Sequence, residues 1–81
     1  MWKYRPFEDY LYAQTGKATL TFRQIETILG DRLPPSASTP RWWHDSGTPQ
    51  SKAWTRAGWR VESVDCTLGF VILGPSPSGP P

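Results

Sequence analysis

The sequence is poor in the residues that most often cross-link a chain or ligate a metal. It has one cysteine, Cys66, and one histidine, His44, among its 81 residues. A single cysteine excludes an internal disulfide, and one cysteine with one histidine provides too few ligands for a zinc site of the usual kind. We therefore expect neither a metal site nor a cofactor. A lone thiol is compatible with a reducing compartment, and we expect a cytoplasmic protein.

Long hydrophobic runs are also absent. No apolar run approaches the ~20 residues that a transmembrane helix requires. Near the N-terminus, Trp2, Lys3 and Arg5 are not followed by the apolar block of a signal peptide. We expect no membrane-spanning segment and no membrane partner.

Groups that could support catalysis are few. His44 and Asp45 form the one histidine–acid pair, but adjacent residues on a helix point apart. Cys66 has no basic or histidine neighbour in the sequence that would lower its pKa. The sequence has no glycine-rich phosphate-binding loop. These absences argue against an enzyme, and no small-molecule substrate is evident.

Acidic residues are scarce in the middle of the chain. The net charge is only +2, but residues 32–60 include five basic residues against one acidic residue, Asp45. The basic residues are Arg32, Arg41, Lys52, Arg56 and Arg60. If these side chains share one surface, that surface would attract phosphate or an acidic partner. The simpler interpretation is a solvated face without a partner, and the sequence leaves both open.

Tryptophan, in contrast, is abundant. Four of the five tryptophans lie between residues 42 and 59. Because tryptophan buries a large apolar area, a few of these rings can supply much of the hydrophobic stabilisation of a small domain, and we expect most of them in the core. The adjacent Trp42 and Trp43 point roughly 100° apart on a helix, so both cannot be equally buried. An exposed indole could stack on a base or on a partner's side chain.

The first half of the chain predicts a helix, a strand and a second helix. Residues 4–14 indicate a helix with an apolar face, and residues 18–21 indicate a short strand. The second helix follows Thr21, which forms a capping box with Gln24, and it ends at Gly30. This second helix has the clearest local signal in the sequence.

The segment after Asp31 predicts a broken helix. Pro34 and Pro35 stop the chain from continuing as a helix, because they remove two backbone donors. Helical structure can restart at Ser36 or at Thr39, where a following proline favours a helix start. A second piece is expected at residues 50–57, ended by a glycine.

The last elements indicate a β-hairpin. Residues 59–65 have a period of two, which places Val61 and Val64 on opposite faces of a strand. A turn at residues 65–69 leads to an apolar strand at residues 70–73.

The chain is expected to form one domain. Its folded part would span residues 1–73. The segment 74–81 consists of proline, glycine and serine, and it has no side chain that could anchor it. We expect a disordered tail there.

The order helix, strand, helix, broken helix and β-hairpin is that of a winged helix-turn-helix domain, which is an α+β fold. In such a domain the short strand pairs with the hairpin, and the last helix is offered to the major groove of DNA. This analogy predicts five nucleic-acid contacts, of which Arg60 lies at the root of the wing. They are Arg41, Trp43, Lys52, Arg56 and Arg60.

Several short motifs resemble those of a known family. They are Tyr4-Arg-Pro-Phe, Leu20-Thr-Phe, Ile25-Glu26, Ile28-Leu29-Gly30, Leu33-Pro-Pro-Ser-Ala37, Trp42-Trp43, Ala53-Trp54 and Ala57-Gly58-Trp59-Arg-Val61. Over residues 4 to 73 the chain looks like a small prokaryotic domain of unknown function, which is found alone or appended to longer proteins. The resemblance implies a fold but no reaction, because the family has no assigned catalytic residues.

Two functions are consistent with these observations. The first is a small nucleic-acid-binding module, with duplex DNA favoured over RNA, that uses a basic face on the tryptophan-rich helical segment and the adjoining hairpin. The second is a protein–protein interaction module, or a homodimer, in which Trp42 or Trp43 with Arg41 forms an exposed contact. Binding that weakens steeply with salt favours the first function, and salt-insensitive binding favours the second.

Overall fold

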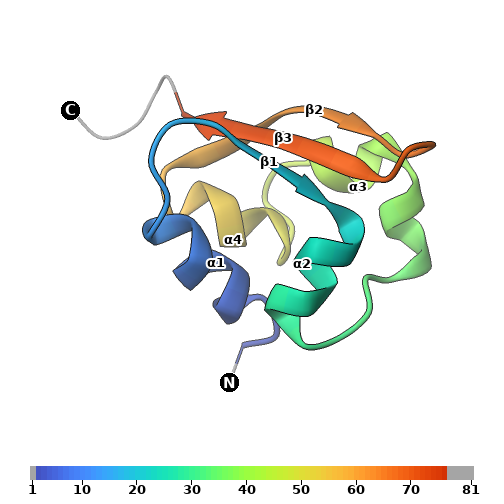
Figure 1. Cartoon of the computed structure of the whole chain (residues 1–81), viewed down its shortest axis with the longest axis horizontal. Helices are drawn as coiled ribbons and strands as arrows, with labels where there is room; N and C mark the ends of the chain where they lie inside the picture. Colours follow the sequence, from blue (N-terminus) through green and yellow to red (C-terminus); the bar gives the residue numbers. More distant parts are fainter. Residues whose placement is uncertain (1, 77–81) are drawn as a thin grey trace.

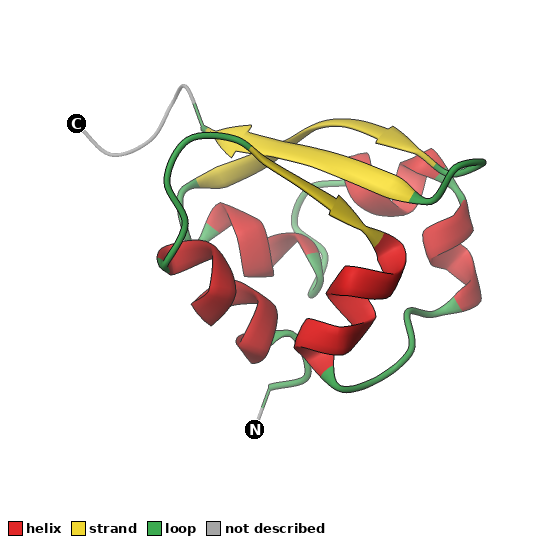
Figure 2. Cartoon of the chain, in the orientation of Figure 1, coloured by secondary structure: helices red, strands yellow, loops and turns green. Residues whose placement is uncertain are grey.

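A three-stranded antiparallel sheet with helices packed against one of its faces forms the molecule (Figure 1, Figure 2). The structure is a computed structural model, and it describes residues 2–76. The elements are α1 (Arg5–Tyr12), β1 (Ala18–Thr21), α2 (Phe22–Leu29), the 3-10 helix η1 (Pro35–Ser38), α3 (Pro40–His44), α4 (Ser51–Thr55), β2 (Trp59–Asp65) and β3 (Phe70–Pro75). The fold is α+β and ends in a β-hairpin, as the sequence predicts.

Local signals determine where α2 begins and ends. The Thr21 hydroxyl oxygen accepts a hydrogen bond from the Gln24 amide at 3.0 Å, and the Gln24 side-chain oxygen accepts one from the Thr21 amide at 2.8 Å. These reciprocal bonds satisfy two amides that the helix itself leaves unpaired. Gly30 ends the helix with a φ of 71°, a left-handed conformation that favours glycine. The predicted capping box and terminator are both confirmed.

The proline-rich middle of the chain forms three short helices. η1 precedes α3, and α4 is shorter than the predicted helix 50–57. Thr39 does occupy the position before α3, but its hydroxyl donates to the Ser36 carbonyl oxygen at 2.8 Å and makes no cap. A five-residue helix without a cap has little stability of its own. α3 therefore depends on the packing of its two tryptophans.

The central strand of the sheet is β3, which pairs antiparallel with β1 on one side and β2 on the other. The register between β2 and β3 shifts between Val61 and Ser63, which marks a β-bulge. A bulge inserts one residue and interrupts the alternation of faces. Val61 and Val64, predicted on opposite faces, consequently both pack against the core. The predicted alternation is wrong beyond the bulge for this reason.

Strand β3 is longer than its predicted range. Gly74 pairs with Arg60, and Pro75 pairs with Trp59. The Ser76 amide then donates to the Gly58 carbonyl oxygen at 2.9 Å. The first residues of the segment 74–81 thus continue the sheet. The remainder of the expected tail, residues 77–81, lies outside the described residues.

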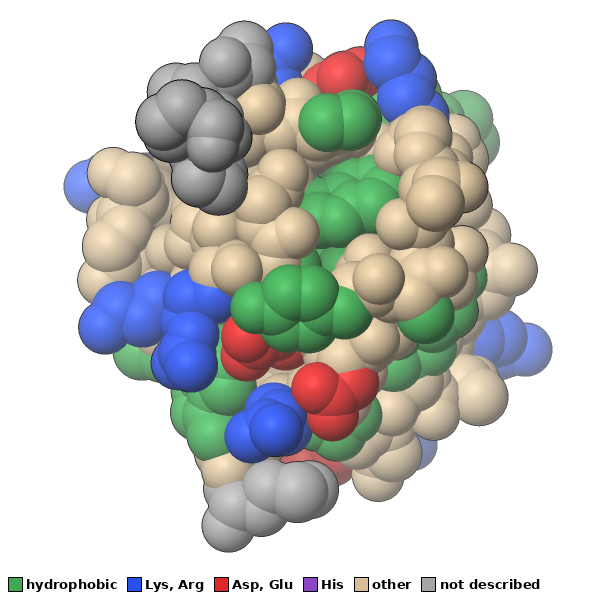
Figure 3. All heavy atoms as spheres, turned by 90° about the vertical axis from the view of Figure 1, so that its left-hand side faces the viewer, with side chains coloured by type: hydrophobic (Ala, Val, Ile, Leu, Met, Phe, Trp, Pro, Cys, Tyr) green, Lys and Arg blue, Asp and Glu red, His purple; other side chains and the backbone are tan. Residues whose placement is uncertain are grey.

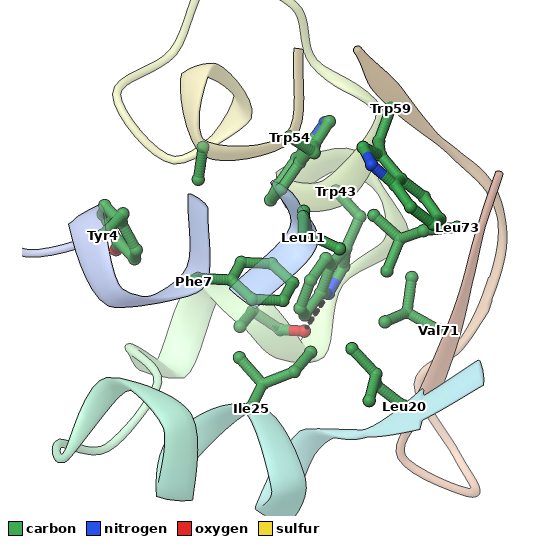
Figure 4. Packing of buried hydrophobic residues seen from close by; sticks show 12 residues of the cluster. Tyr4, Phe7, Leu11, Leu20, Ile25, Trp43, Trp54, Trp59, Val71 and Leu73 are labelled. Atoms are coloured by element: carbon green, nitrogen blue, oxygen red, sulfur yellow. Dashed lines mark hydrogen bonds between the residues drawn. The ribbon is translucent and has the colours of Figure 1, made fainter. Parts of the chain in front are cut away.

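The core lies between the sheet and the helices, and it is rich in indole rings. Trp43, Trp54 and Trp59 are buried. The Trp43 ring lies at the centre of the cluster, between Phe7 of α1 and the side chains of β3 (Figure 4). It stacks on Phe22 and on Trp54, with ring centroids 5.1 Å and 5.8 Å apart. The prediction that most tryptophans form the core is confirmed.

Candidate functional site

Trp43 does not reach the surface. Its side chain is 1% exposed, and its Nε1 donates a hydrogen bond to the Ala37 carbonyl oxygen at 2.9 Å (Figure 4). A ring that already packs on Phe22 and Trp54 has no free face for a base. This corrects the selection of Trp43 as a nucleic-acid contact, because its role is to fill and orient the core.

Arg41 lies on α3 and has a largely exposed side chain. Its Nε is 3.3 Å from Asp45 Oδ2, four residues along the chain. This ion pair offsets the charge of Arg41 locally. Arg41 also lines neither of the two hollows that flank α4. The structure therefore does not bring Arg41 together with the other predicted contacts.

Lys52 and Arg56 do lie together, as their spacing of four residues predicts. They line a hollow of about 310 Å³ between α1 and α4, which we call the α1–α4 hollow. Its lining residues are Trp2, Arg5, Glu8, Pro49, Lys52 and Arg56. The hollow thus combines three basic side chains, one carboxylate and one indole.

The carboxylate of this hollow belongs to Glu8, which is only 4% exposed. Its Oε2 lies 3.6 Å from Arg56 Nε. Its Oε1 is buried and has no hydrogen-bond partner among the described residues. Buried carboxylate oxygens are nearly always hydrogen-bonded, because an unpaired one costs desolvation free energy without compensation. Glu8 Oε1 is therefore an exception, because the described residues provide it with no hydrogen-bond donor.

Arg56 packs over two other side chains that line the hollow, Trp2 and Glu8. Its guanidinium carbon lies 5.6 Å from the centroid of the Trp2 ring, within the range of a cation–π contact. The same guanidinium group pairs with Glu8. Trp2 is half-buried and also makes an edge contact with Tyr4. Because the Arg56 side chain is 63% exposed, it is held there by contacts on one side only.

Arg60 lines a second, smaller hollow of about 190 Å³ to which α4 also contributes. His44 and Asp45 at the end of α3 and Ser51 of α4 lie in its wall. Neither Arg60 nor Lys52 makes an ion pair with any residue in the described part of the chain. α4 is therefore bordered by basic side chains from its own sequence and from β2.

The surface around α1 carries both signs of charge. On that side of the molecule basic and acidic side chains border one another, with hydrophobic side chains between them (Figure 3). Arg5 Nε donates to Asp9 Oδ1 at 3.1 Å, and this hydrogen bond and the charge of Asp9 raise the pKa of Arg5. The face is therefore not a uniform basic patch, and the charges free to meet a phosphate are those without a carboxylate neighbour.

Sequence reasoning missed four residues of the hollow, namely Trp2, Arg5, Glu8 and Pro49. A signal for Glu8 was present in the sequence. Tyr4, Glu8 and Leu11 are spaced as one stripe of a helix, and both apolar members of that stripe are buried. A carboxylate within an apolar stripe is unusual and marks a candidate site.

The part of the chain between residues 2 and 76 contains no group of three histidine, cysteine, aspartate or glutamate side chains that could hold a metal ion. Partial burial raises the pKa of the Cys66 thiol, and the neighbouring Asp65 carboxylate adds to the effect. A raised pKa lowers the thiolate fraction at neutral pH. The thiol is therefore a poor nucleophile in this environment.

The fold and the hollow together define a small α+β domain with a tryptophan-rich core and a carboxylate-containing hollow between two helices. The chain belongs to the family described as Domain of unknown function (DUF7662), which matches residues 4–73. The match runs from the residue before α1 into β3, which confirms the family resemblance of the motifs. Searches of curated proteins and of solved structures found no match. No helix in residues 2–76 has the length and apolarity to cross a membrane.

Proposed function

We propose that this domain binds nucleic acid, with duplex DNA as its target, through the surface around α4. The observation that carries the proposal is that Lys52 and Arg60 border α4 without an ion-pair partner among the described residues. A basic side chain without an ion-pair partner is available to a phosphate. Binding to phosphates releases counterions and provides most of the affinity of small DNA-binding modules.

The order of the strands supports a winged-helix interpretation. β3 lies between β1 and β2, so the short first strand pairs with the hairpin, and α4 directly precedes β2. In a winged helix the helix before the hairpin faces the major groove. α4 has only five residues, which is short for reading several base pairs. We therefore assign Lys52 and Arg60 to phosphates, which fix position without reading sequence.

The protein-interaction alternative has less support from the arrangement of the aromatic residues. Trp43 is buried. The half-buried Trp42 ring makes edge and tilted contacts with Tyr4, Trp43 and Trp54, with centroids 6.3 Å, 4.6 Å and 6.4 Å away. These contacts leave Trp42 little free ring surface for a partner. An exposed hot spot built from Trp42 or Trp43 with Arg41 therefore lacks most of its aromatic area.

The proposal is tested with the double charge reversal Lys52→Glu/Arg60→Glu. The titration uses a duplex of mixed sequence at several salt concentrations, and circular dichroism checks that the variant is folded. We expect the parent to bind with a steep salt dependence. The slope should fall by about 1 for each phosphate contact that the variant loses, and the affinity should fall at every salt concentration.

A matched control separates the α4 surface from net charge. Arg23→Glu/Arg32→Glu makes the same change in charge at exposed residues that line neither hollow beside α4. We expect this control to retain most of the affinity and of the salt slope. Equal losses in both double variants, or unchanged binding after the reversal at Lys52 and Arg60, would show that the proposed surface is wrong.

A further inference from the structure

We propose that the α1–α4 hollow binds one unpaired guanine nucleotide. In this arrangement Glu8 accepts hydrogen bonds from the base, Trp2 stacks on it, and Lys52 contacts its phosphate. The inference rests on the proposed function in the contact of Lys52 with a phosphate, and it adds to the duplex contacts of that surface a separate site for an unpaired base.

Glu8 provides the polar recognition group. Its Oε1 is buried without a hydrogen-bond partner in residues 2–76, and its Oε2 has only the ion pair with Arg56. A carboxylate accepts hydrogen bonds and donates none, so its partner must present donors. Two donors side by side on one edge of a ligand would satisfy both oxygens at once.

The contacts of the Arg56 guanidinium indicate which shape of ligand fits the α1–α4 hollow. Its guanidinium is planar and rich in donors. It lies 5.6 Å from the Trp2 ring centroid and reaches Glu8 Oε2 at 3.6 Å. A planar ring with a donor edge would make the same two contacts. In the proposed complex Arg56, whose side chain is 63% exposed, turns outward and gives up its contacts with the indole and the carboxylate to the ligand.

The charge around the hollow excludes the simplest competing ligand, an arginine side chain from a partner protein. Arg5, Lys52 and Arg56 line the hollow together with the one carboxylate, Glu8. Asp9 pairs with Arg5, so Lys52 and Arg56 against Glu8 leave an excess of one positive charge, which disfavours a further cation. A nucleotide brings an anionic phosphate to the basic side chains and a donor edge to the carboxylate. Lys52 has no carboxylate partner in the described chain, which makes it the phosphate contact.

Guanine matches a carboxylate better than the other bases do. Its Watson–Crick edge places the N1 proton beside the N2 amino group, so two donors face the same direction. Adenine and cytosine present one amino donor next to an acceptor, and thymine presents one donor between two acceptors. In a duplex this edge is already paired. The ligand must therefore be an unpaired base, which proteins recognise by stacking and by contacts to this edge.

The experiment compares GMP, IMP and AMP by NMR titration of the parent protein, with the Trp2 indole proton as the reporter. IMP keeps the N1 proton and lacks the N2 amino group. We expect GMP to bind at least about fivefold tighter than IMP and AMP, since one good bidentate contact discriminates by that factor or more. Equal affinities for GMP and AMP, or no GMP binding, would overturn the inference.

Variants of the hollow test the role of each group. Glu8→Gln should abolish the preference for GMP over AMP, and Asp9→Asn, its neighbour in α1, should leave it unchanged. Lys52→Gln should weaken GMP and leave the uncharged guanosine unaffected. If Glu8→Gln bound GMP as tightly as the parent, the carboxylate would not be the recognition group.

A stability measurement separates recognition from a structural role. If Glu8 serves binding, Glu8→Gln and Glu8→Met should keep or raise the melting temperature, because each removes a buried carboxylate with an unpaired oxygen. A lowered melting temperature with GMP preference retained would assign Glu8 to structure and overturn the inference.

Salt-dependent duplex binding without GMP binding would remove only the inference. GMP selectivity without duplex binding would overturn the proposed function.

Discussion

At the scale of single residues, the two adjacent tryptophans of α3 have different roles. Trp43 is enclosed by the core and donates a hydrogen bond to the Ala37 carbonyl oxygen. Trp42 lies at the edge of the same aromatic cluster and is half-buried. The angle between neighbouring residues on a helix explains why they differ. The residues packed on Trp43, such as Phe22, decide which of the two is buried.

We predict that Trp43→Phe destabilises the domain more than Trp42→Phe. The change at Trp43 leaves a cavity and removes the Nε1 donor from the Ala37 carbonyl oxygen, which keeps only the long contact with Cys66 Sγ at 3.9 Å. The expected loss is about 2–4 kcal/mol in the free energy of unfolding. The change at Trp42 should cost less than about 1.5 kcal/mol. Urea unfolding of the two variants measures the difference, and equal losses would mean that the Nε1 hydrogen bond contributes nothing.

Residue identity alone could not place Trp43 or Glu8. The partners of Trp43 are Phe22 and Ala37, and no local pattern links them to α3. Glu8 shares an apolar stripe with Tyr4 and Leu11, which is a signal, but an acid in the first turn of a helix is also common because the helix dipole favours it. Only the packing of α4 over α1 encloses its carboxylate in a hollow. Contacts between distant segments therefore assign the roles of these residues.

At the scale of elements, the signals that lie within a few residues of each other predicted α2 and the first two strands correctly, but they did not predict the missing cap of α3 or the short α4. The bounds of β1 and β2 match the prediction, and α2 begins and ends at the predicted cap and glycine. Features that depend on pairing were missed. The bulge between Val61 and Ser63 and the extension of β3 to Pro75 exist only because two strands are aligned. Sequence periodicity has no information about that alignment.

Gly74 shows how such an alignment constrains a residue. A β-carbon at Gly74 would overlap the carboxyl group of Glu62, which lies over it from β2. Glu62 also pairs with Lys17 at 3.0 Å. An alanine would therefore displace the Glu62 side chain from this pair. Against this, alanine in a strand is favoured over glycine by roughly 0.5–1 kcal/mol, since glycine loses more backbone entropy on folding.

We predict that Gly74→Ala is nearly neutral in the parent, because the loss of a surface ion pair offsets the gain in backbone entropy. In a Glu62→Ala background the same change should stabilise the domain by roughly 0.5–1 kcal/mol. A double-mutant cycle from urea unfolding measures this coupling. Identical effects of Gly74→Ala in both backgrounds would show that Glu62 does not rest on Gly74.

At the scale of the whole molecule, the candidate site is formed by the first and the last α-helix of the sequence, α1 and α4, together with residues next to them. Residues 2–8 and residues 49–56 meet because α1 packs against α4. The basic segment 32–60 therefore contains only part of the residues that line the α1–α4 hollow. Arg41 lies outside the hollows beside α4, whereas Arg5, outside that segment, lines the α1–α4 hollow. Linear charge patterns locate a basic region, and the tertiary fold decides which charges act together.

The forces that hold the fold differ from those proposed for binding. Every ion pair in residues 2–76 includes at least one side chain that is 46% exposed or more. Exposed pairs contribute about 0–1 kcal/mol each and often nothing measurable. The buried aromatic cluster, which contains Phe7, Trp43, Trp54 and Trp59, supplies the larger share of the stabilisation.

We therefore predict that salt separates stability from binding. Raising sodium chloride to about 1 M shortens the Debye length to about 3 Å, yet the free energy of unfolding in urea should change by no more than about 1 kcal/mol. Duplex binding by the α4 surface should disappear over the same range, because each phosphate contact depends on counterion release. If the free energy of unfolding fell by several kcal/mol instead, pairs such as Lys17 with Glu62 would be holding the fold. The measured salt slope would then contain a contribution from unfolding. Only the slope that remains after correction for the folded fraction would come from the phosphate contacts of Lys52 and Arg60.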